Sequence, residues 1–375
     1  MPSRRCWLLF TPEAEVDLLR TMCSIYSPSG SEREIASYLV ERMASLGWDS
    51  YLDGAGNAVG ITGEGPETVM LLGHIDTVPG FIPVEVRDGA LYGRGSVDAK
   101  GPLAAFICAA ARAATGRAVG GRRKRTIVVG AVGEETDESP GARYLVDSGP
   151  APDFCIIGEP GGWSSVTLGY RGRLCVEAVV RRPVGHPASG RPSVMEAAVG
   201  LWEGLSRWTR ELSPSAQSCN AQRRPPLGNS RPFEMLDVIL QDIRKESDHF
   251  EESARLVMDF RLPPGISPAE LGLELAERHP EAEFRFRGGQ PGWRGSKNNP
   301  LVKAFVNAIR EERGDLGFRL KLGTSDMNVV APTWGCPTVA FGPGDSRLDH
   351  TPGEHLSISE YQSAIDVLAR VLRNL

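Results

Sequence analysis

Residues 69–76, VMLLGHID, join an apolar run to a histidine and an aspartate. Two later stretches have the same form, TIVVGAVGEE at residues 126–135 and FCIIGEP at residues 154–160. Each indicates a buried β-strand whose carboxyl end is followed by acidic or histidine side chains. In an open parallel α/β sheet, ligands bind at the carboxyl ends of the strands. The sequence therefore predicts an α/β domain with a mostly parallel sheet and a site at one of its edges.

The composition indicates a globular protein with more than one domain. The 375 residues are 41% hydrophobic and 24% charged, which is enough to bury a large core in two domains. The net charge of −5 and the isoelectric point near 5.8 argue against a nucleic-acid-binding protein. No apolar run is long enough to span a membrane, and the seven cysteines form no CxxC pair. We therefore expect a soluble cytoplasmic protein with reduced thiols.

The pattern of elements changes near residue 164. From there the chain is expected to form strand, helix, two strands, helix and strand, an order typical of the ferredoxin-like split motif. The expected strands are residues 166–180, 235–243, 254–262 and 283–287, and the expected helices are residues 192–212 and 268–278. We predict a catalytic domain made of residues 1–163 and 292–375, interrupted by an inserted ferredoxin-like α+β domain at residues 164–291.

Several helices of the catalytic domain have recognisable starts. Thr11, followed by Pro12, is expected to cap a first helix, and Ser29 or Ser31 a second. Residues 103–114 are almost all apolar and predict a helix buried against the sheet. Residues 357–360, SISE, have the form of a capping box and predict the start of the last helix.

A histidine and several carboxylates at one sheet edge indicate a divalent metal site. Their negative charges would repel one another unless a cation lay among them. The motifs contain no cysteine, so zinc, cobalt or manganese suits them better than calcium. We predict His74, Glu135 and Glu159 as ligands. Asp98, in the segment GRGSVDAKG at residues 93–101, is predicted to bridge two metal ions.

Two further acids are predicted to act beside these ligands. Asp76, two residues after His74, is expected to fix the tautomer of the imidazole. Glu134 is expected to stay unligated and to act as general base on the attacking water, whose pKa the metal ions lower toward neutrality. An HxD or a GEE alone is weak, because acids are also common at helix N-termini. All of these motifs in order favour a metal site.

The motifs resemble those of the dinuclear zinc hydrolases that include aminoacylase, acetylornithine deacetylase and succinyl-diaminopimelate desuccinylase. The matching segments are GHIDTVP at residues 73–79, GRGSVDAKG at 93–101, GEE at 133–135 and GEP at 158–160. The resemblance extends over nearly the whole chain. It implies two zinc or cobalt ions per subunit, an inserted domain that forms a homodimer, and hydrolysis of an amide.

The resemblance also implies roles for two histidines away from the strand ends. A last metal ligand is expected before a Pro-x-Glu stretch, and His350 in LDHTPGEH at residues 348–355 fits, with His355 as the other choice. A histidine of the inserted domain is expected to reach the partner subunit's site and stabilise the oxyanion. His186, in GHPAS at residues 185–189, matches that position. The simpler interpretation of His186 is a histidine on a surface loop.

Within the family, the chain resembles the hydrolases that release lysine or ornithine from the amino-group carrier protein LysW in lysine and arginine biosynthesis. The similar segments are DAKGPLA at residues 98–104, GEPGGW at 158–163, TLGYRG at 167–172 and LGTSDMN at 322–328. This likeness implies cleavage of the amide between the γ-carboxyl of the carrier's C-terminal glutamate and the product's α-amino group. Arg261 is expected either to clamp the product's α-carboxylate or to pair with Asp259. Gly323, Thr324 and Ser325 are expected to contact the substrate.

Other activities remain open from the sequence. The deacylases commonly carry a Gly-Gly-x-x-x-Asn-x-x-Pro segment that residues 229–262 do not reproduce, which counts against acetylornithine deacetylase and the desuccinylase. A broad carboxypeptidase or dipeptidase of the family is a further alternative. A binding scaffold without chemistry is another, but it would not need to keep a general base beside a complete set of ligands.

Overall fold

The computed structural model describes residues 11–115, 124–186, 190–212 and 230–375. The chain divides into two compact units, and each is described by itself. The catalytic unit consists of Met1–Gly169, Gly295–Arg319 and Ser325–Leu375, and the inserted unit of Tyr170–Arg294 and Leu320–Thr324. The sequence-based boundaries assign residues 164–169, 292–294 and 320–324 to the opposite unit.

The catalytic unit is built on a twisted sheet. Its strands are β1 (Asp49–Leu52), β2 (Ala58–Thr62), β3 (Glu67–His74), β6 (Lys124–Ala131), β7 (Phe154–Gly158), β8 (Ser165–Tyr170), β14 (Gly317–Lys321) and β15 (Thr338–Ala340). Along the sheet they run in the order β1-β2-β6-β3-β7-β15-β8, and β14 pairs with β8. The central strands β6, β3, β7 and β15 are mutually parallel, which confirms the predicted fold class. A small separate sheet contains β4 (Glu85–Arg87), β5 (Ala90–Tyr92) and β16 (His355–Ser357).

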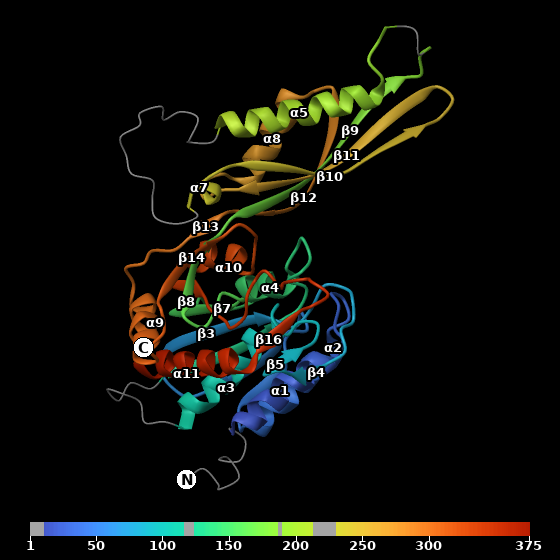
Figure 1. Ribbon diagram of the computed structural model, residues 1–375. Helices are drawn as coiled ribbons and strands as arrows, with labels where there is room; N and C mark the ends of the chain where they lie inside the picture. The colour runs from blue at the N-terminus through green and yellow to red at the C-terminus, as the bar shows by residue number, and fades with distance from the viewer. Residues whose placement is uncertain (1–10, 116–123, 187–189, 213–229) are drawn as a thin grey trace. The chain divides into compact units, whose positions relative to one another are not determined.

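Helices cover both faces of this sheet (Figure 1). On one face lie α1 (Pro12–Ser24), α2 (Arg33–Ser45), α3 (Lys100–Thr115) and α11 (Ile358–Asn374), and on the other α4 (Pro140–Ser148) and α10 (Met327–Trp334). Helix α9 (Pro300–Glu311) packs against α11. Among the residues that the structure describes, no helix combines the length and the hydrophobicity needed to cross a membrane.

The starts of these helices agree with the sequence in two cases and differ in one. Thr11 caps α1 by accepting a hydrogen bond from the amide of Ala14, and Ser357 caps α11 in the same way, as predicted. The prediction for α2 is wrong, because that helix begins at Arg33, after Glu32. The Ser29 hydroxyl donates instead to the carboxylate of Asp76 at 2.7 Å, so it is not available as a helix cap.

Glycines at one level of the sheet allow α3 to approach the strands closely. Gly73 of β3 lies in register with Gly130 of β6 and Gly158 of β7. A β-carbon on Gly158 would lie 3.0 Å from the ring of Phe106, and one on Gly73 would lie 3.2 Å from the β-carbon of Leu103. Glycine in a strand commonly marks such a close approach. As predicted, the apolar helix is buried against the sheet, directly below the strand ends that carry the site.

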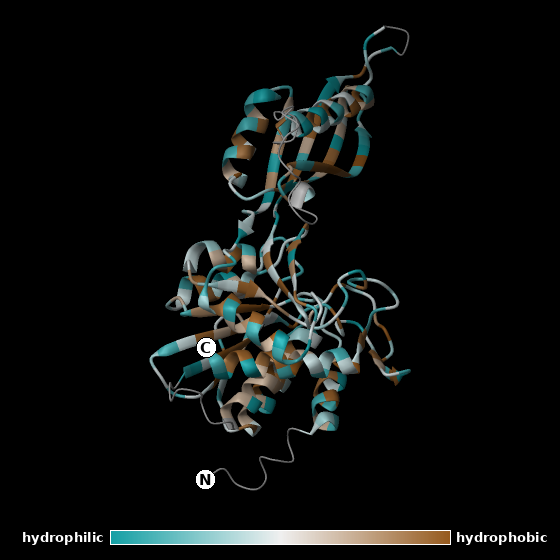
Figure 2. Ribbon diagram, turned by 60° about the vertical axis from the view of Figure 1, so that its left-hand side comes forward, coloured by the Kyte–Doolittle hydropathy of each residue, from teal (hydrophilic) through white to brown (hydrophobic). Residues whose placement is uncertain are grey.

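The inserted unit has the predicted ferredoxin-like order of elements. They are β9 (Gly172–Pro183), α5 (Val194–Leu212), α7 (Ser230–Phe233), β10 (Asp237–Ser247), β11 (Glu251–Leu262), α8 (Pro268–Arg278), β12 (Ala282–Gln290) and β13 (Trp293–Arg294). The strands pair antiparallel in the order β10-β11-β9-β12. Helices α5 and α8 pack on one face, where Met258 and Phe260 are fully buried. Figure 2 shows hydrophobic residues alternating with polar ones along these strands.

One predicted strand is divided in the structure. Residues 166–180 were expected to form a single strand, but the chain breaks at Arg171 into β8 and β9, which belong to different sheets. A β-carbon on Gly172 would lie 2.3 Å from the carbonyl oxygen of Gln290. The close backbone approach at this glycine explains why the alternating pattern continues while the strand does not.

Candidate metal centre

Three neighbouring strands end beside one another and supply most of the site. His74 is the last residue of β3 and pairs in register with Ala131, the last residue of β6. Glu134 and Glu135 follow β6 after a short turn, and Glu159 directly follows β7. The structure thus brings together the acidic and histidine side chains that the sequence placed at strand ends.

Asp98 and His350 reach the same place from loops. The Nε2 atom of His74 lies 3.1 Å from Oδ1 of Asp98, and the Nε2 atom of His350 lies 3.1 Å from Oδ2 of the same carboxylate. His350 Nε2 also lies 2.9 Å from Oε1 of Glu135. Each oxygen of Asp98 therefore faces a different histidine, which is the arrangement expected of a carboxylate shared by two metal ions.

The donor atoms form groups of the size that a metal ion needs. The potential ligand atoms of His74, Asp98 and Glu159 lie within 4.8 Å of one another, and so do those of Asp98, Glu135 and His350. These groups offer imidazole nitrogens and carboxylate oxygens and no thiolate, a donor set that suits zinc, cobalt or manganese. The residues present therefore fit a pair of divalent cations with Asp98 between them.

A third group also meets the distance criterion. It consists of His74, Glu134 and Glu135, with Glu134 Oε2 3.9 Å from His74 Nε2. Geometry alone therefore allows Glu134 to be either a ligand or an unligated base. The first two groups account for every other predicted ligand without Glu134, which favours the role of base.

The protonation of the site follows from its crowding. Hydrogen bonds to Asp98 and Glu135 raise the pKa of His350 to about 10. Burial alone would lower the pKa of His74, but its contacts with Asp76 and Asp98 raise it well above the usual value. Burial also raises the pKa of Glu134 well above its usual value, and the neighbouring acids add to the effect. Protons thus balance the charge of these acids, and a metal ion would displace them.

The carboxylate of Asp76 holds the loop that carries Glu134 and Glu135. Its Oδ1 accepts the main-chain N–H of Glu134 at 3.1 Å, and its Oδ2 accepts that of Glu135 at 3.0 Å. The nearest hydrogen-bond partner of His74 Nδ1 is the main-chain oxygen of Asp76 at 3.0 Å, and the Asp76 carboxylate is 3.4 Å away. Asp76 thus contacts the imidazole of His74 and also fixes the backbone of Glu134 and Glu135.

Several residues of the site escaped sequence reasoning. Ser29 holds Asp76, while Glu354 and Arg94 form a buried ion pair beneath the Asp98 loop. The sequence does mark Glu354, as the glutamate of the Pro-x-Glu stretch after His350, but that stretch indicates the position of the histidine and not a role for the glutamate. His350 itself has a φ of 62°, a left-handed conformation that is uncommon for residues other than glycine and is often found at functional sites.

The remaining predicted residues lie away from the strand ends or in the inserted unit. His186 is exposed just after β9. Arg261, on β11, donates to Asp259 at 2.8 Å, which is the pairing that the sequence left as its alternative role. Gly323 and Thr324 belong to the inserted unit, and Ser325 begins the next segment of the catalytic unit. Ser325 is buried, and its hydroxyl accepts the amide of Met327 at the start of α10.

Comparison with known proteins identifies the family of the chain. The chain matches the family model described as peptidase family M20/M25/M40 over residues 70–374. A LysW-lysine hydrolase from Deinococcus radiodurans is 43% identical and covers 97% of this chain and 98% of its own length. A LysW-lysine/LysW-ornithine hydrolase from Sulfurisphaera tokodaii is 27% identical over 96% of this chain and 95% of its own length. The crystal structure of an M20 family metallo-carboxypeptidase from Sulfolobus solfataricus shares the fold, with a TM-score of 0.70 and 19% identity. The match covers 96% of this chain and 98% of that chain.

Proposed function

Because this chain belongs to peptidase family M20/M25/M40, we propose that it is the hydrolase that releases lysine or ornithine from the amino-group carrier protein LysW. The observation that carries the proposal is the 43% identity to a LysW-lysine hydrolase across 97% of the chain. The bond broken would be the amide between the γ-carboxyl of the carrier's C-terminal glutamate and the α-amino group of the released amino acid. The free cysteines among the described residues accord with a reducing cytoplasmic compartment.

The cofactors would be two divalent ions per subunit, zinc or cobalt. One would be held by His74, Asp98 and Glu159, and the other by Asp98, Glu135 and His350. When bound, such ions polarise the scissile carbonyl and lower the pKa of the attacking water. The geometry that supports this assignment is the position of Asp98 between the two histidines.

Glu134 would perform the proton transfers. It lies beside the ligand atoms, with its side chain 12% exposed, and the amide of its own backbone is fixed by Asp76. In the proposed reaction its carboxylate takes a proton from the attacking water and then gives a proton to the leaving amine. In the metal-free protein, burial raises the pKa of Glu134 above its usual value, and a carboxylate with a raised pKa accepts a proton more readily.

His186 would stabilise the oxyanion, acting from the partner subunit of a homodimer. Support for this comes from its exposure on the inserted unit and from its match to the family pattern. Subunit complementation tests it. A His186→Ala variant and a Glu134→Gln variant are each expected to be nearly inactive, and mixed dimers of the two should recover about a quarter to a half of the wild-type turnover. No recovery in verified mixed dimers would place His186 in the reaction of its own subunit, and wild-type turnover by the His186→Ala variant alone would place it outside the reaction.

Recognition of the substrate would involve Arg261 and the segment Gly323–Ser325. Arg261 is partly buried and has Asp259 on one side, so its guanidinium would have to divide its N–H donors between that acid and the product's α-carboxylate. An Arg261→Lys variant keeps the charge but loses the planar fork of donors. We expect it to raise KM for the carrier substrate with little change in kcat. An unchanged KM would leave Arg261 as a partner of Asp259 alone.

The function is tested by measuring amino-acid release from alternative substrates. The metal-reconstituted enzyme would be given a carrier protein ending in γ-glutamyl-lysine or γ-glutamyl-ornithine, N-acetylornithine, and succinyl-diaminopimelate. We expect kcat/KM to be far higher for the carrier substrates, and the ratio of lysine to ornithine released identifies the product. Preference for either small acyl amino acid would overturn the carrier assignment and leave the metal centre standing.

A further inference from the structure

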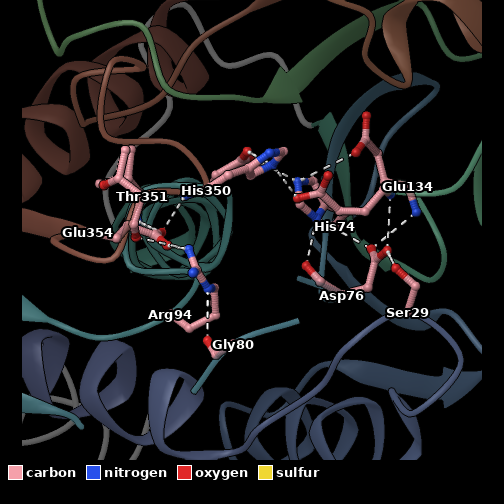
Figure 3. Close-up of polar contacts among 12 residues, drawn as sticks. Ser29, His74, Asp76, Gly80, Arg94, Glu134, His350, Thr351 and Glu354 are labelled. Atoms are coloured by element: carbon pink, nitrogen blue, oxygen red, sulfur yellow. Dashed lines mark hydrogen bonds and ion pairs between the residues drawn. The ribbon is translucent and has the colours of Figure 1, made fainter. Parts of the chain in front are cut away.

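Glu354 is a buried carboxylate with no assigned role, and it holds the main chain of Asp98. The side chain is fully buried. Its Oε1 accepts the main-chain N–H groups of Val97 at 2.9 Å and of Asp98 at 3.1 Å. Its Oε2 accepts from Nη1 of Arg94 at 2.7 Å (Figure 3). These three hydrogen bonds of the carboxylate therefore all go to the loop that carries the shared ligand.

Arg94 connects Glu354 to two other loops of the site. Its Nε donates to the carbonyl oxygen of Gly80 at 3.0 Å, in the segment that follows His74 and Asp76. Its Nη1 also donates to the carbonyl oxygen of Thr351, the residue after His350, at 3.3 Å. The ion pair thus joins the loops that follow β3 and precede α3 to the loop that carries the last histidine. A buried charge requires such a partner, because removing either member leaves the other uncompensated.

The arrangement has a counterpart on the other side of the centre. Asp76, two residues after His74, accepts the successive amides of Glu134 and Glu135, and Glu354, four residues after His350, accepts the successive amides of Val97 and Asp98. Each histidine loop therefore contributes one buried carboxylate that fixes the backbone of an acidic ligand from another loop. Hydrogen bonds to ionised acceptors are the stronger kind, so both attachments are stiff.

Asp98 is the ligand most sensitive to such support. It is the residue common to both groups of ligand atoms, and each of its oxygens lies 3.1 Å from a different histidine nitrogen. A small rotation of its backbone would move one oxygen toward its histidine and the other away. Functional sites tolerate displacements of only about 0.5 Å.

We propose that Glu354 is a positioning residue that fixes the backbone of Asp98 so that its two oxygens can serve two metal ions at once. The inference rests on the proposed two-metal function and adds a residue to it. Outer partners of metal ligands typically change metal affinity by about 10–100-fold when they are replaced. Glu354 is expected to act within that range on both ions, because Asp98 is shared.

Glu354→Gln is the first test, because a carboxamide cannot accept hydrogen bonds on both sides. If its oxygen faces the amides of Val97 and Asp98, its NH₂ group faces the guanidinium of Arg94, and the reverse orientation places NH₂ against the two amides. The metal-free variant would be titrated with Co²⁺ while stoichiometry, affinity and the visible absorption of the bound cobalt are recorded. We expect about 10–100-fold weaker binding and an altered cobalt spectrum.

Glu15→Gln is the matched control in the same unit. Glu15 is also buried, and its two oxygens accept from Nε and Nη2 of Arg112, each at 2.6 Å. It has the same charge and the same kind of partner, but its two carboxylate oxygens bond to a helix residue rather than to a loop that carries a metal ligand. The control should lose thermal stability while keeping two cobalt ions with the wild-type affinity and spectrum.

Glu354→Asp keeps the charge and decides the matter if the glutamine variant does not fold. The shorter side chain cannot reach both the amides and Arg94, so weaker cobalt binding is again expected. Two cobalt ions bound by either folded variant with wild-type affinity and spectrum would overturn the positioning role. If the wild-type protein itself binds no pair of ions, the proposed two-metal function fails instead, and the two failures are thus distinguishable.

Discussion

Replacing Glu134 with glutamine removes the proposed base while keeping the size of the side chain. Glu134 belongs to neither of the two ligand groups that share Asp98, so both metal ions should stay bound. A positioned general base contributes about 10²–10⁴-fold to rate, which corresponds to about 3–5 kcal/mol of activation free energy. We therefore expect kcat to fall by two to four orders of magnitude while KM changes little.

The assay measures kcat and KM for lysine release together with the metal content of the same sample. Glu138→Gln is the matched control, because Glu138 lies on the same loop but is exposed and outside the ligand groups. A variant at position 134 that keeps its metals and stays within tenfold of wild-type turnover would refute the role of base. Loss of one metal ion would refute it differently, by assigning Glu134 to the third group with His74 and Glu135.

His350, Ser29 and Phe260 each make a contact whose contribution can be measured. The pKa of His350 is raised to about 10 in the metal-free protein, and a ligating imidazole must be neutral, so metal uptake at pH 7 should release a proton and metal affinity should rise with pH toward 10. Calorimetry in buffers of different ionisation heat measures the proton release, and a binding heat that does not depend on the buffer would contradict it. Ser29→Ala removes the 2.7 Å hydrogen bond to Asp76 and should lower the free energy of unfolding by about 1.5–3 kcal/mol in denaturant titrations, whereas the exposed Ser31→Ala should have no such effect. Phe260→Ala in the core of the inserted unit should cost about 3–5 kcal/mol in the same titration, and a cost below 1 kcal/mol would contradict the packing described.

The parts of the structure that were predictable are those with local signals. His74, Glu134 and Glu159 follow apolar strands within a few residues, so the chain order alone placed them at one edge. The cap at Thr11 is likewise a contact between residues three apart. Long-range contacts carry no such signal. The Glu354 carboxylate meets a main-chain amide 257 residues earlier in the chain, and no periodicity encodes that pairing.

The errors have the same physical origin. Ser29 has the residue type and the position of a helix cap, yet its hydroxyl bonds to Asp76, 47 residues away. The strand expected at residues 166–180 is broken because Gly172 lies against the backbone near Gln290, which the alternating pattern cannot reveal. In both cases a tertiary contact overrides a correct local propensity.

The ligand set also has a consequence for the chain as a polymer. Asp98 and Glu135 precede the inserted unit in sequence, whereas His350 follows it, so an ion bound by these three residues would act as a cross-link that closes a loop around the whole insertion. The entropic free-energy cost of closing a loop in the unfolded chain grows only slowly with loop length, by about 0.6 kcal/mol for each doubling. An insertion of almost any length could therefore be accommodated at this point at little thermodynamic cost. The catalytic unit would remain tied at its centre while the inserted unit varied in size.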